Sequence, residues 1–216
     1  GTLDLLLTTP ITPRQYLWGK LRGLVSFLNL LLALPILTIA IFSVYTVIGS
    51  ARGWPQAEMT RTVATSQGLG QIHDSLILPE APLLAALVLM PFIASCVIVG
   101  MTWSLKAKSV LGSVVISVIC IGGWMAVFGF CGFNAAAGIP FIGTFINVLS
   151  PATSLFMIID PWTYIGGFVD SPTGGHIILL FASLFAATVF SVFIYSMLTG
   201  MVRQFDTTVR KLTGVA

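Results

Sequence analysis

Few residues in this chain could do acid–base, nucleophilic or metal chemistry, and their spacing fits no common catalytic motif. The 216 residues include two histidines, three cysteines and seven acidic side chains. His73 and His176 are far apart in the sequence, and neither an H-E-x-x-H metal motif nor a G-x-S-x-G nucleophile motif occurs. We therefore interpret both histidines as solvated loop residues, and we predict no catalytic residue and no metal site.

The three cysteines, Cys96, Cys120 and Cys131, all fall inside long apolar runs. This placement favours small apolar packing residues over a disulfide framework. The same runs contain no ionisable acid, base or histidine, whereas ion-coupled carriers place such groups near the bilayer midplane and channels often ring their pores with charge. The pattern argues against a secondary carrier, an ATP-independent channel and an intramembrane enzyme.

Four of these apolar runs are long enough to cross a membrane. They cover residues 24–48, 83–103, 110–132 and 177–201 and contain no Asp, Glu, Lys, Arg or His. About 20 apolar helical residues span the hydrocarbon core. The chain is 56% hydrophobic and only 8% charged, with mean hydropathy +1.01, whereas soluble domains carry about 25% charged residues. We predict an all-α, multi-pass membrane bundle forming a single domain over 1–216, and we read the small net charge of +3 as no sign of nucleic-acid binding.

The cations of the chain are sorted by side, which predicts the orientation. If the first span runs outward, both chain ends are cytoplasmic and eight cations share that side with two on the other. The cytoplasmic set is Arg14, Lys20, Arg22, Lys106, Lys108, Arg203, Arg210 and Lys211, and the outer set is Arg52 and Arg61. We expect an inner or plasma membrane location, with an outer loop at 49–82 and a cytoplasmic tail at 202–216.

A fifth apolar stretch, residues 139–159, would make the cation ratio five to five if it crossed the membrane. It is interrupted by Ser150-Pro151, because proline removes a backbone donor and disfavours helix in the residue before it. Each half is too short to cross alone. We therefore predict a re-entrant pair of short helices on the outer side, covered by protein or lining a water-filled cavity.

Amides are rare at membrane depth, where an unpaired polar group is costly. Asn29 in the first span and Asn147 in the broken helix are the two examples, and Asn147 is followed closely by Ser150-Pro151. These residues either bond a neighbouring helix or line a substrate pathway. Small residues at every fourth position also predict close helix packing, within the chain or between two copies. They are Ser183, Ala187 and Ser191 in the last span, and Ser113 and Ser117 in the third, extended by Gly122-Gly123.

The segment before the first span, residues 1–22, has unusually complete helix-start chemistry. Thr2 can cap a short apolar helix over residues 3–7. Thr12, Pro13 and Gln15 then form a T-P-x-Q capping box with proline at the first helical position. One interpretation is a generic interfacial helix leading into a span. The other is a stiff cytoplasmic element that receives motion from a soluble partner.

This segment, GTLDLLLTTPITPRQYLWGK, resembles the region before the third span of type 2 ATP-binding-cassette exporter permeases. That family has a G-T-L-x-x-L-L-x-x-P-[IL]-[ST] run followed by a small residue and Lys. The order of the later elements is also similar to the family: span, outer loop, two spans, an outer broken helix and a last span. The family's first two spans have no counterpart here, and Gly1 is not an initiator methionine, so we expect a C-terminal fragment of a longer permease.

The resemblance implies that residues 3–7 are a coupling helix that docks on a separate ATPase subunit. ATP and magnesium would be bound by that partner, since no G-x-x-x-x-G-K-[ST] motif occurs in this chain. A second permease half or a second copy would complete the transporter within membrane lipid. The partner-interface residues carried over are Leu3, Asp4, Leu6, Leu7, Pro10, Thr12, Pro13, Gly19 and Lys20, and the pathway candidates are Asn29, Asn147, Ser150 and Pro151. A non-transporting membrane scaffold for a soluble partner remains the alternative.

Overall fold

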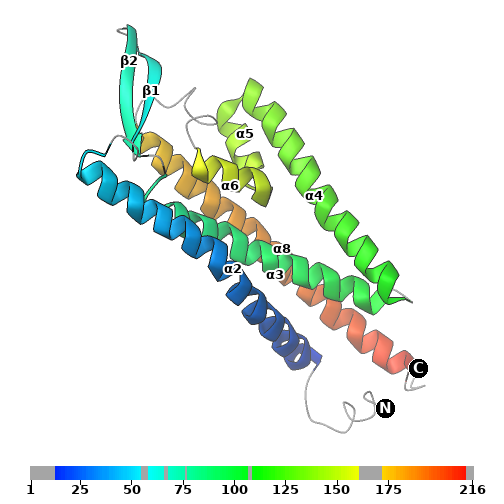
Figure 1. The fold of residues 1–216 in the computed structure, drawn as a ribbon. Coiled ribbons are helices and arrows are strands. Elements are labelled where there is room, and N and C mark those ends of the chain that lie inside the picture. The colour runs from blue at the N-terminus through cyan, green and yellow to red at the C-terminus, as the bar shows by residue number, and fades with distance from the viewer. Residues whose placement is uncertain are drawn as a thin grey trace.

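The computed structural model describes residues 13–54, 58–65, 68–75, 77–106, 109–160 and 172–212. Within them the chain forms helices joined by one β-hairpin (Figure 1). The elements are α2 (Pro13–Ala51), β1 (Glu58–Thr65), β2 (Gly68–Ser75), α3 (Ala81–Lys106), α4 (Val110–Gly138), α5 (Pro140–Asn147), α6 (Pro151–Ile159) and α8 (Pro172–Leu212). The predicted short helix at residues 3–7 lies outside the described residues.

Four helices are long and apolar enough to cross a membrane, which indicates a membrane-embedded protein and confirms the predicted number of long apolar helices. Their candidate spans are Trp18–Ala51, Ala81–Ser104, Val110–Ala136 and Gly174–Arg203. Helix α8 continues to Leu212, so most of the segment expected as a tail extends the last helix.

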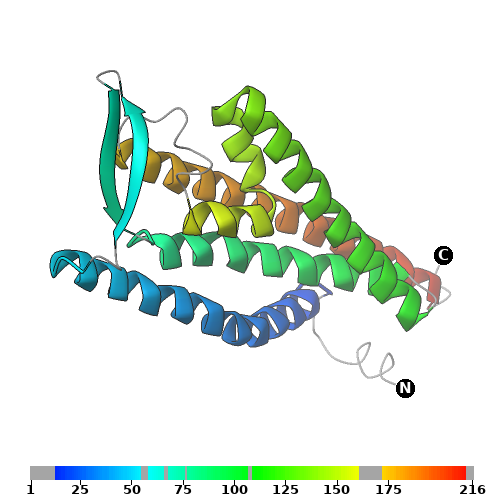
Figure 2. The same cartoon turned by 45° about the horizontal axis from the view of Figure 1, so that its top comes forward.

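The long helices α2, α3 and α8 run side by side, and α4 meets α3 at one end and diverges from it toward the other (Figures 1 and 2). The hairpin, α5 and α6 lie at one end of this bundle, which we call the hairpin end. The start of α2, the end of α3, the start of α4 and the end of α8 lie at the opposite end, which we call the terminal end. Helix α3 is the most enclosed of the four. In its most apolar stretch 39% is buried inside the protein, compared with 6% in α2 and in α4.

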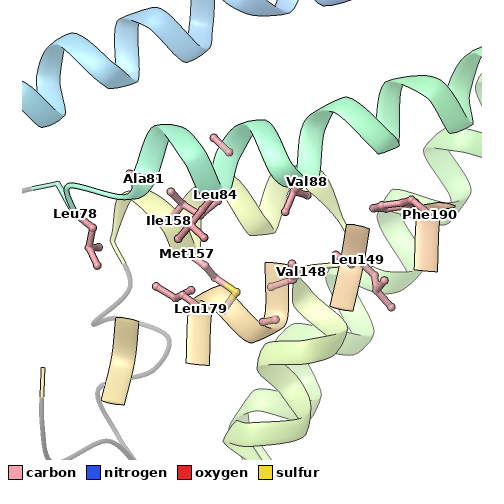
Figure 3. Close-up of a cluster of buried hydrophobic side chains, with 13 residues drawn as sticks. Leu78, Ala81, Leu84, Val88, Val148, Leu149, Met157, Ile158, Leu179 and Phe190 are labelled. Carbon is pink, nitrogen blue, oxygen red and sulfur yellow. The ribbon is translucent and has the colours of Figure 1, made fainter. Parts of the chain in front are cut away.

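The core consists of two clusters of buried apolar side chains. The larger lies toward the hairpin end and joins α3, α6 and α8, where Leu84, Ile158 and Leu179 converge (Figure 3). The smaller joins α2, α3 and α8 and contains Leu21, Val97, Ile98, Leu198 and Met201. Because the short helix α6 contributes to the larger cluster, the broken segment is part of the folded core.

Local chemistry explains where several helices begin. Prolines stand at the first positions of α2, α5 and α6, where the missing backbone N–H removes no helical hydrogen bond. Ser109 caps α4, with its Oγ accepting a hydrogen bond from the backbone N of Gly112 at 3.2 Å. Pro35 lies inside α2, where it leaves the carbonyl of Leu31 without its usual helical donor. Figure 2 shows that α2 is visibly curved.

The expected outer loop at 49–82 contains an antiparallel hairpin that the sequence interpretation missed. Its register pairs Glu58 with Ser75 and Thr65 with Gly68. Threonine and other β-branched residues recur in the first strand, which favours an extended chain. The fold is therefore a helical membrane bundle with one added β-hairpin between α2 and α3.

The predicted small-residue faces are buried only in part within the described chain, and their packing between two copies stays a prediction. In α8, Ser183 is buried as expected, but the buried stripe continues through Ala182, Ala186 and Phe190 instead of Ala187 and Ser191. In α4, Ser113 and Ser117 are buried. A side chain at Gly122 or Gly123 would meet no atom within 4 Å, so this glycine pair marks no close helix approach within the described chain.

Candidate functional site

The segment expected to be a broken helix bends by 120° between residues 141–147 and Pro151–Ile159. Ser150 is in an extended conformation, with φ −100° and ψ 115°, and Pro151 starts α6. The carbonyl of Asn147 accepts hydrogen bonds from the backbone N of Ser150 at 3.0 Å and from Thr153 Oγ1 at 2.5 Å. The predicted break at Ser150-Pro151 is confirmed, and these bonds close the corner between the two short helices.

Glycine residues allow this corner to pack closely against α4. A Cβ atom at Gly132 would lie 2.8 Å from both the Cγ and the backbone N of Asn147. A Cβ atom at Gly143 in α5 would overlap the backbone of Ala136 in α4. Only glycine allows backbones this close without displacement. The contact of α5 with α4 therefore depends on residues without side chains.

Asn147 carries the buried amide of the corner, with 1% of its surface exposed. Within the described residues its side-chain oxygen and nitrogen have no hydrogen-bond partner. A buried amide left unpaired costs about 1–3 kcal/mol. The unpaired Asn147 amide therefore lowers the stability of the fold. It can bind a group that the described chain does not supply.

The structure brings together Asn147, Ser150 and Pro151 but places Asn29 in a different region. Asn29 is on α2, where the adjacent Leu28 packs against the smaller core cluster. Val148, the neighbour of Asn147, belongs to the larger cluster. The side-chain oxygen of Asn29 is also buried without a partner in the described chain. The two amides predicted for one pathway therefore lie beside separate core clusters.

Trp124 links the corner to the middle of α4. Its Nε1 donates a hydrogen bond to the carbonyl of Leu149 at 3.2 Å. Its ring also contacts Phe128 with centroids 4.5 Å apart and Phe193 of α8 at 5.9 Å. A single side chain thus connects α4, the corner and the last long helix.

Two hydroxyl groups form a junction at the hairpin end that the sequence interpretation missed. Ser43 Oγ approaches the carbonyls of Leu78 and Pro79 at 3.3 and 3.1 Å. Thr46 Oγ1 donates to the carbonyl of Ser43 in its own helix at 2.8 Å and also lies 3.2 Å from the carbonyl of Ile77. Both residues are buried. Their three-residue spacing in a largely apolar part of the helix was the available signal, because residues three apart share a helix face. We call this contact the hairpin-end junction.

Beside this junction, His176 Nδ1 of α8 contacts the Glu80 carboxylate that directly precedes α3. The interpretation of His176 as a solvated loop residue is therefore wrong: it belongs to a helix and pairs with an acid. About a third of the His176 side chain is exposed, which limits the contribution of the pair to stability. The pair nevertheless connects α8 to the residue that directly precedes α3.

Three of the residues assigned to the partner interface are described. Helix α2 begins at Pro13 as predicted. The Lys20 side chain is exposed, and a side chain at Gly19 would meet nothing within 4 Å. Leu3, Asp4, Leu6, Leu7, Pro10 and Thr12 lie outside the described residues. Gly19 and Lys20 thus lie on an open face of α2 at the terminal end, whereas Leu21 packs in the smaller core cluster.

Within the described ranges, no group of three or more His, Cys, Asp or Glu side chains could hold a metal ion. The groups that the site does offer are amides, hydroxyls and aromatic rings in an apolar surrounding, which suit binding and positioning. No family model, curated protein or solved structure matches the chain.

Proposed function

We propose that this protein is the permease subunit of an ATP-driven exporter of the type 2 ATP-binding-cassette class. The observation that carries the proposal is the match of residues 1–22, with Gly1-Thr2-Leu3, Pro10 and Gly19-Lys20 in the family's positions. The order of later elements supports it: a long helix, an intervening hairpin, two long helices, a bent pair and a last long helix. The chain would form part of the substrate pathway and transmit motion from a separate ATPase subunit.

In the proposed topology the terminal end is cytoplasmic. This orientation follows from the eight-to-two distribution of cations and the positive-inside rule. The α5–α6 pair would then enter and leave the membrane on the outer side, because α4 ends and α8 begins at the hairpin end. Asn147 and Ser150 would lie at depth on that side, where an unpaired amide can contact a passing substrate.

Coupling would depend on residues 3–7. A carboxylate introduced on the apolar face of this segment, by Leu6→Asp, would be buried without a partner in a docking groove at a cost of several kcal/mol. We expect loss of substrate-stimulated ATP hydrolysis by the full-length complex in lipid, with the long helices intact. Leu5→Asp is the matched control, because Leu5 is next to Leu6 in the sequence but does not lie on the predicted apolar face. This variant should retain stimulation. Normal assembly and stimulation in Leu6→Asp would exclude residues 3–7 as the coupling element.

Topology is tested separately by cysteine labelling of intact cells. Cysteines at Ser66 and Thr173 should react with a membrane-impermeant reagent, and one at Ser109 should not. A reporter fused after Ser171 should read as external. Labelling at Ser109 from outside, or a cytoplasmic reporter after Ser171, would refute the topology. A scaffold for another soluble partner would keep this topology but would co-purify without an ATPase.

A further inference from the structure

An apolar cavity of about 260 Å³ lies between α3, α4 and α8. Phe92 and Trp103 from α3, Trp124 from α4, and Phe190 and Phe193 from α8 contribute aromatic rings to its wall. The rings of Phe92 and Phe190 meet edge to face with centroids 5.6 Å apart, and those of Trp124 and Phe193 are 5.9 Å apart. Large rings on three separate helices therefore frame this space.

Two polar groups of the wall already have partners within the chain. Ser95 Oγ donates to the carbonyl of Phe92 at 2.6 Å, and Trp124 Nε1 donates to that of Leu149. No charged side chain lines the cavity. The buried polar side-chain atoms that lack a partner in the described chain belong to residues outside this wall. A polar ligand group placed here would lose its hydration without replacement, so the cavity fits an alkyl chain.

A cation stands at one end of the cavity. Trp103 lines the cavity near the terminal end of α3, and Lys106 Nζ lies 5.8 Å from the centroid of its ring. The Lys106 side chain is exposed, and among the described residues no carboxylate pairs with it. Lysine beside tryptophan is typical of the level of lipid head groups. The apolar space thus leads toward a positive charge that has no carboxylate partner among the described residues.

A second hollow, of about 390 Å³, shares the side chain of Ile121 with the apolar cavity as part of its wall. Its wall contains four serines from the end of α3 and the start of α4: Ser104, Ser109, Ser113 and Ser117. Hydroxyl groups therefore lie next to the terminal end of the apolar cavity. The lining changes from aromatic to hydroxyl-bearing toward the end of the helices that carries Lys106.

We propose that this cavity binds one alkyl chain of an anionic amphiphile, with the charged head group beside Lys106. A cavity of about 150 Å³ holds a benzene-sized molecule in other proteins, so the present one has room for a longer apolar segment. Lipid chains surround membrane helices, which supplies the occupant, and the cation selects the sign of the head group. The proposal concerns binding alone and does not depend on the transport function proposed above.

The test uses the full-length protein in nanodiscs of phosphatidylcholine without ATP. The probe is dodecyl phosphate with a photoreactive diazirine in its chain, and cross-linked positions are mapped by mass spectrometry. Adducts on cavity residues such as Trp103 and Ile121 should be suppressed saturably by unlabelled dodecyl phosphate. Adducts on the exposed face of α2, for example at Leu30 and Leu31, report bulk lipid contact and should not saturate.

Three variants separate the parts of the proposal. Cys120 lines the cavity, whereas Cys131 lies on the same helix away from it, and both are exposed cysteines. Cys120→Phe should abolish the saturable adducts, and Cys131→Phe should retain them. Lys106→Gln should raise the half-maximal concentration of dodecyl phosphate about fivefold, as expected for one lysine near a membrane surface. The same variant should leave competition by dodecylphosphocholine unchanged.

Each contrary result overturns a stated part. If cavity adducts are absent or never saturate, the cavity does not bind an alkyl chain. Equal retention of the saturable adducts in Cys120→Phe and Cys131→Phe would place the binding site elsewhere. If Lys106→Gln affects anionic and zwitterionic competitors equally, the head group is not selected by this cation.

Discussion

Replacing Gly132 by alanine tests how the α5–α6 corner is seated on α4. The added Cβ would lie 2.8 Å from the backbone N and from the Cγ of Asn147, closer than carbon atoms tolerate. Because one contact is with backbone, α5 must move away or the side chain of Asn147 must be displaced. Overpacking of this kind costs about 1–3 kcal/mol. Alanine also favours the helix over glycine by about 1 kcal/mol, which offsets part of that cost.

The matched control is Gly122→Ala on the same helix, where the new methyl group meets nothing within 4 Å. Both variants gain the same helix propensity, so the difference between them isolates the packing cost of about 1–3 kcal/mol. The assay is thermal unfolding of the full-length protein in nanodiscs, and each kcal/mol corresponds to a shift of about 2–4 °C for a unit of about 150–250 residues. Equal midpoints for Gly132→Ala and Gly122→Ala would refute the close approach of α5 to α4.

Three further substitutions test other contacts by the same unfolding assay. Asn147→Leu should raise the free energy of unfolding by about 1–3 kcal/mol, because it removes a buried amide without partners in the described chain; a loss of stability would mean that the amide is bonded. Ser43→Ala should lower stability by about 1 kcal/mol by breaking the hairpin-end junction, whereas the exposed Ser26→Ala should change it little. Trp124→Phe should cost about 1 kcal/mol through the lost bond to Leu149, and an unchanged midpoint would contradict that bond.

Length and hydropathy were enough to predict the four long apolar helices, because a run of about 20 uncharged residues has few alternatives to a membrane-spanning helix. Proline chemistry predicted the start of α2 at Pro13 and the break before Pro151, since both follow from a missing N–H and a fixed backbone angle. These features depend on neighbours in the sequence. For that reason the long helices, the start of α2 and the break before Pro151 could be predicted from the sequence.

Features that depend on distant contacts could not be predicted. A helix that is apolar all round has no period that identifies its buried face, so the buried stripe through Ala182, Ala186 and Phe190 on α8 was not predicted. Gly122 and Gly132 lie in the same apolar helix, and the sequence does not distinguish them. Of the two, only Gly132 lies close to the backbone of another segment. The hairpin lacked an Asn-Gly or Asp-Gly turn signal. Carbonyl partners for Ser43 came from a segment 35 residues away.

The hairpin-end junction fixes α2 at a point far from its start, and this makes the helix a lever arm. Ser43 and Thr46 hold α2 against the carbonyls that precede α3, and about 30 residues of helix separate this fulcrum from Pro13. At 1.5 Å per residue the arm is about 45 Å long if taken as straight, so each degree of tilt displaces Pro13 by about 0.8 Å. A tilt of a few degrees about this point would displace Pro13 by a few ångströms, and it would have to shift Leu21 within the smaller core cluster on α3 and α8.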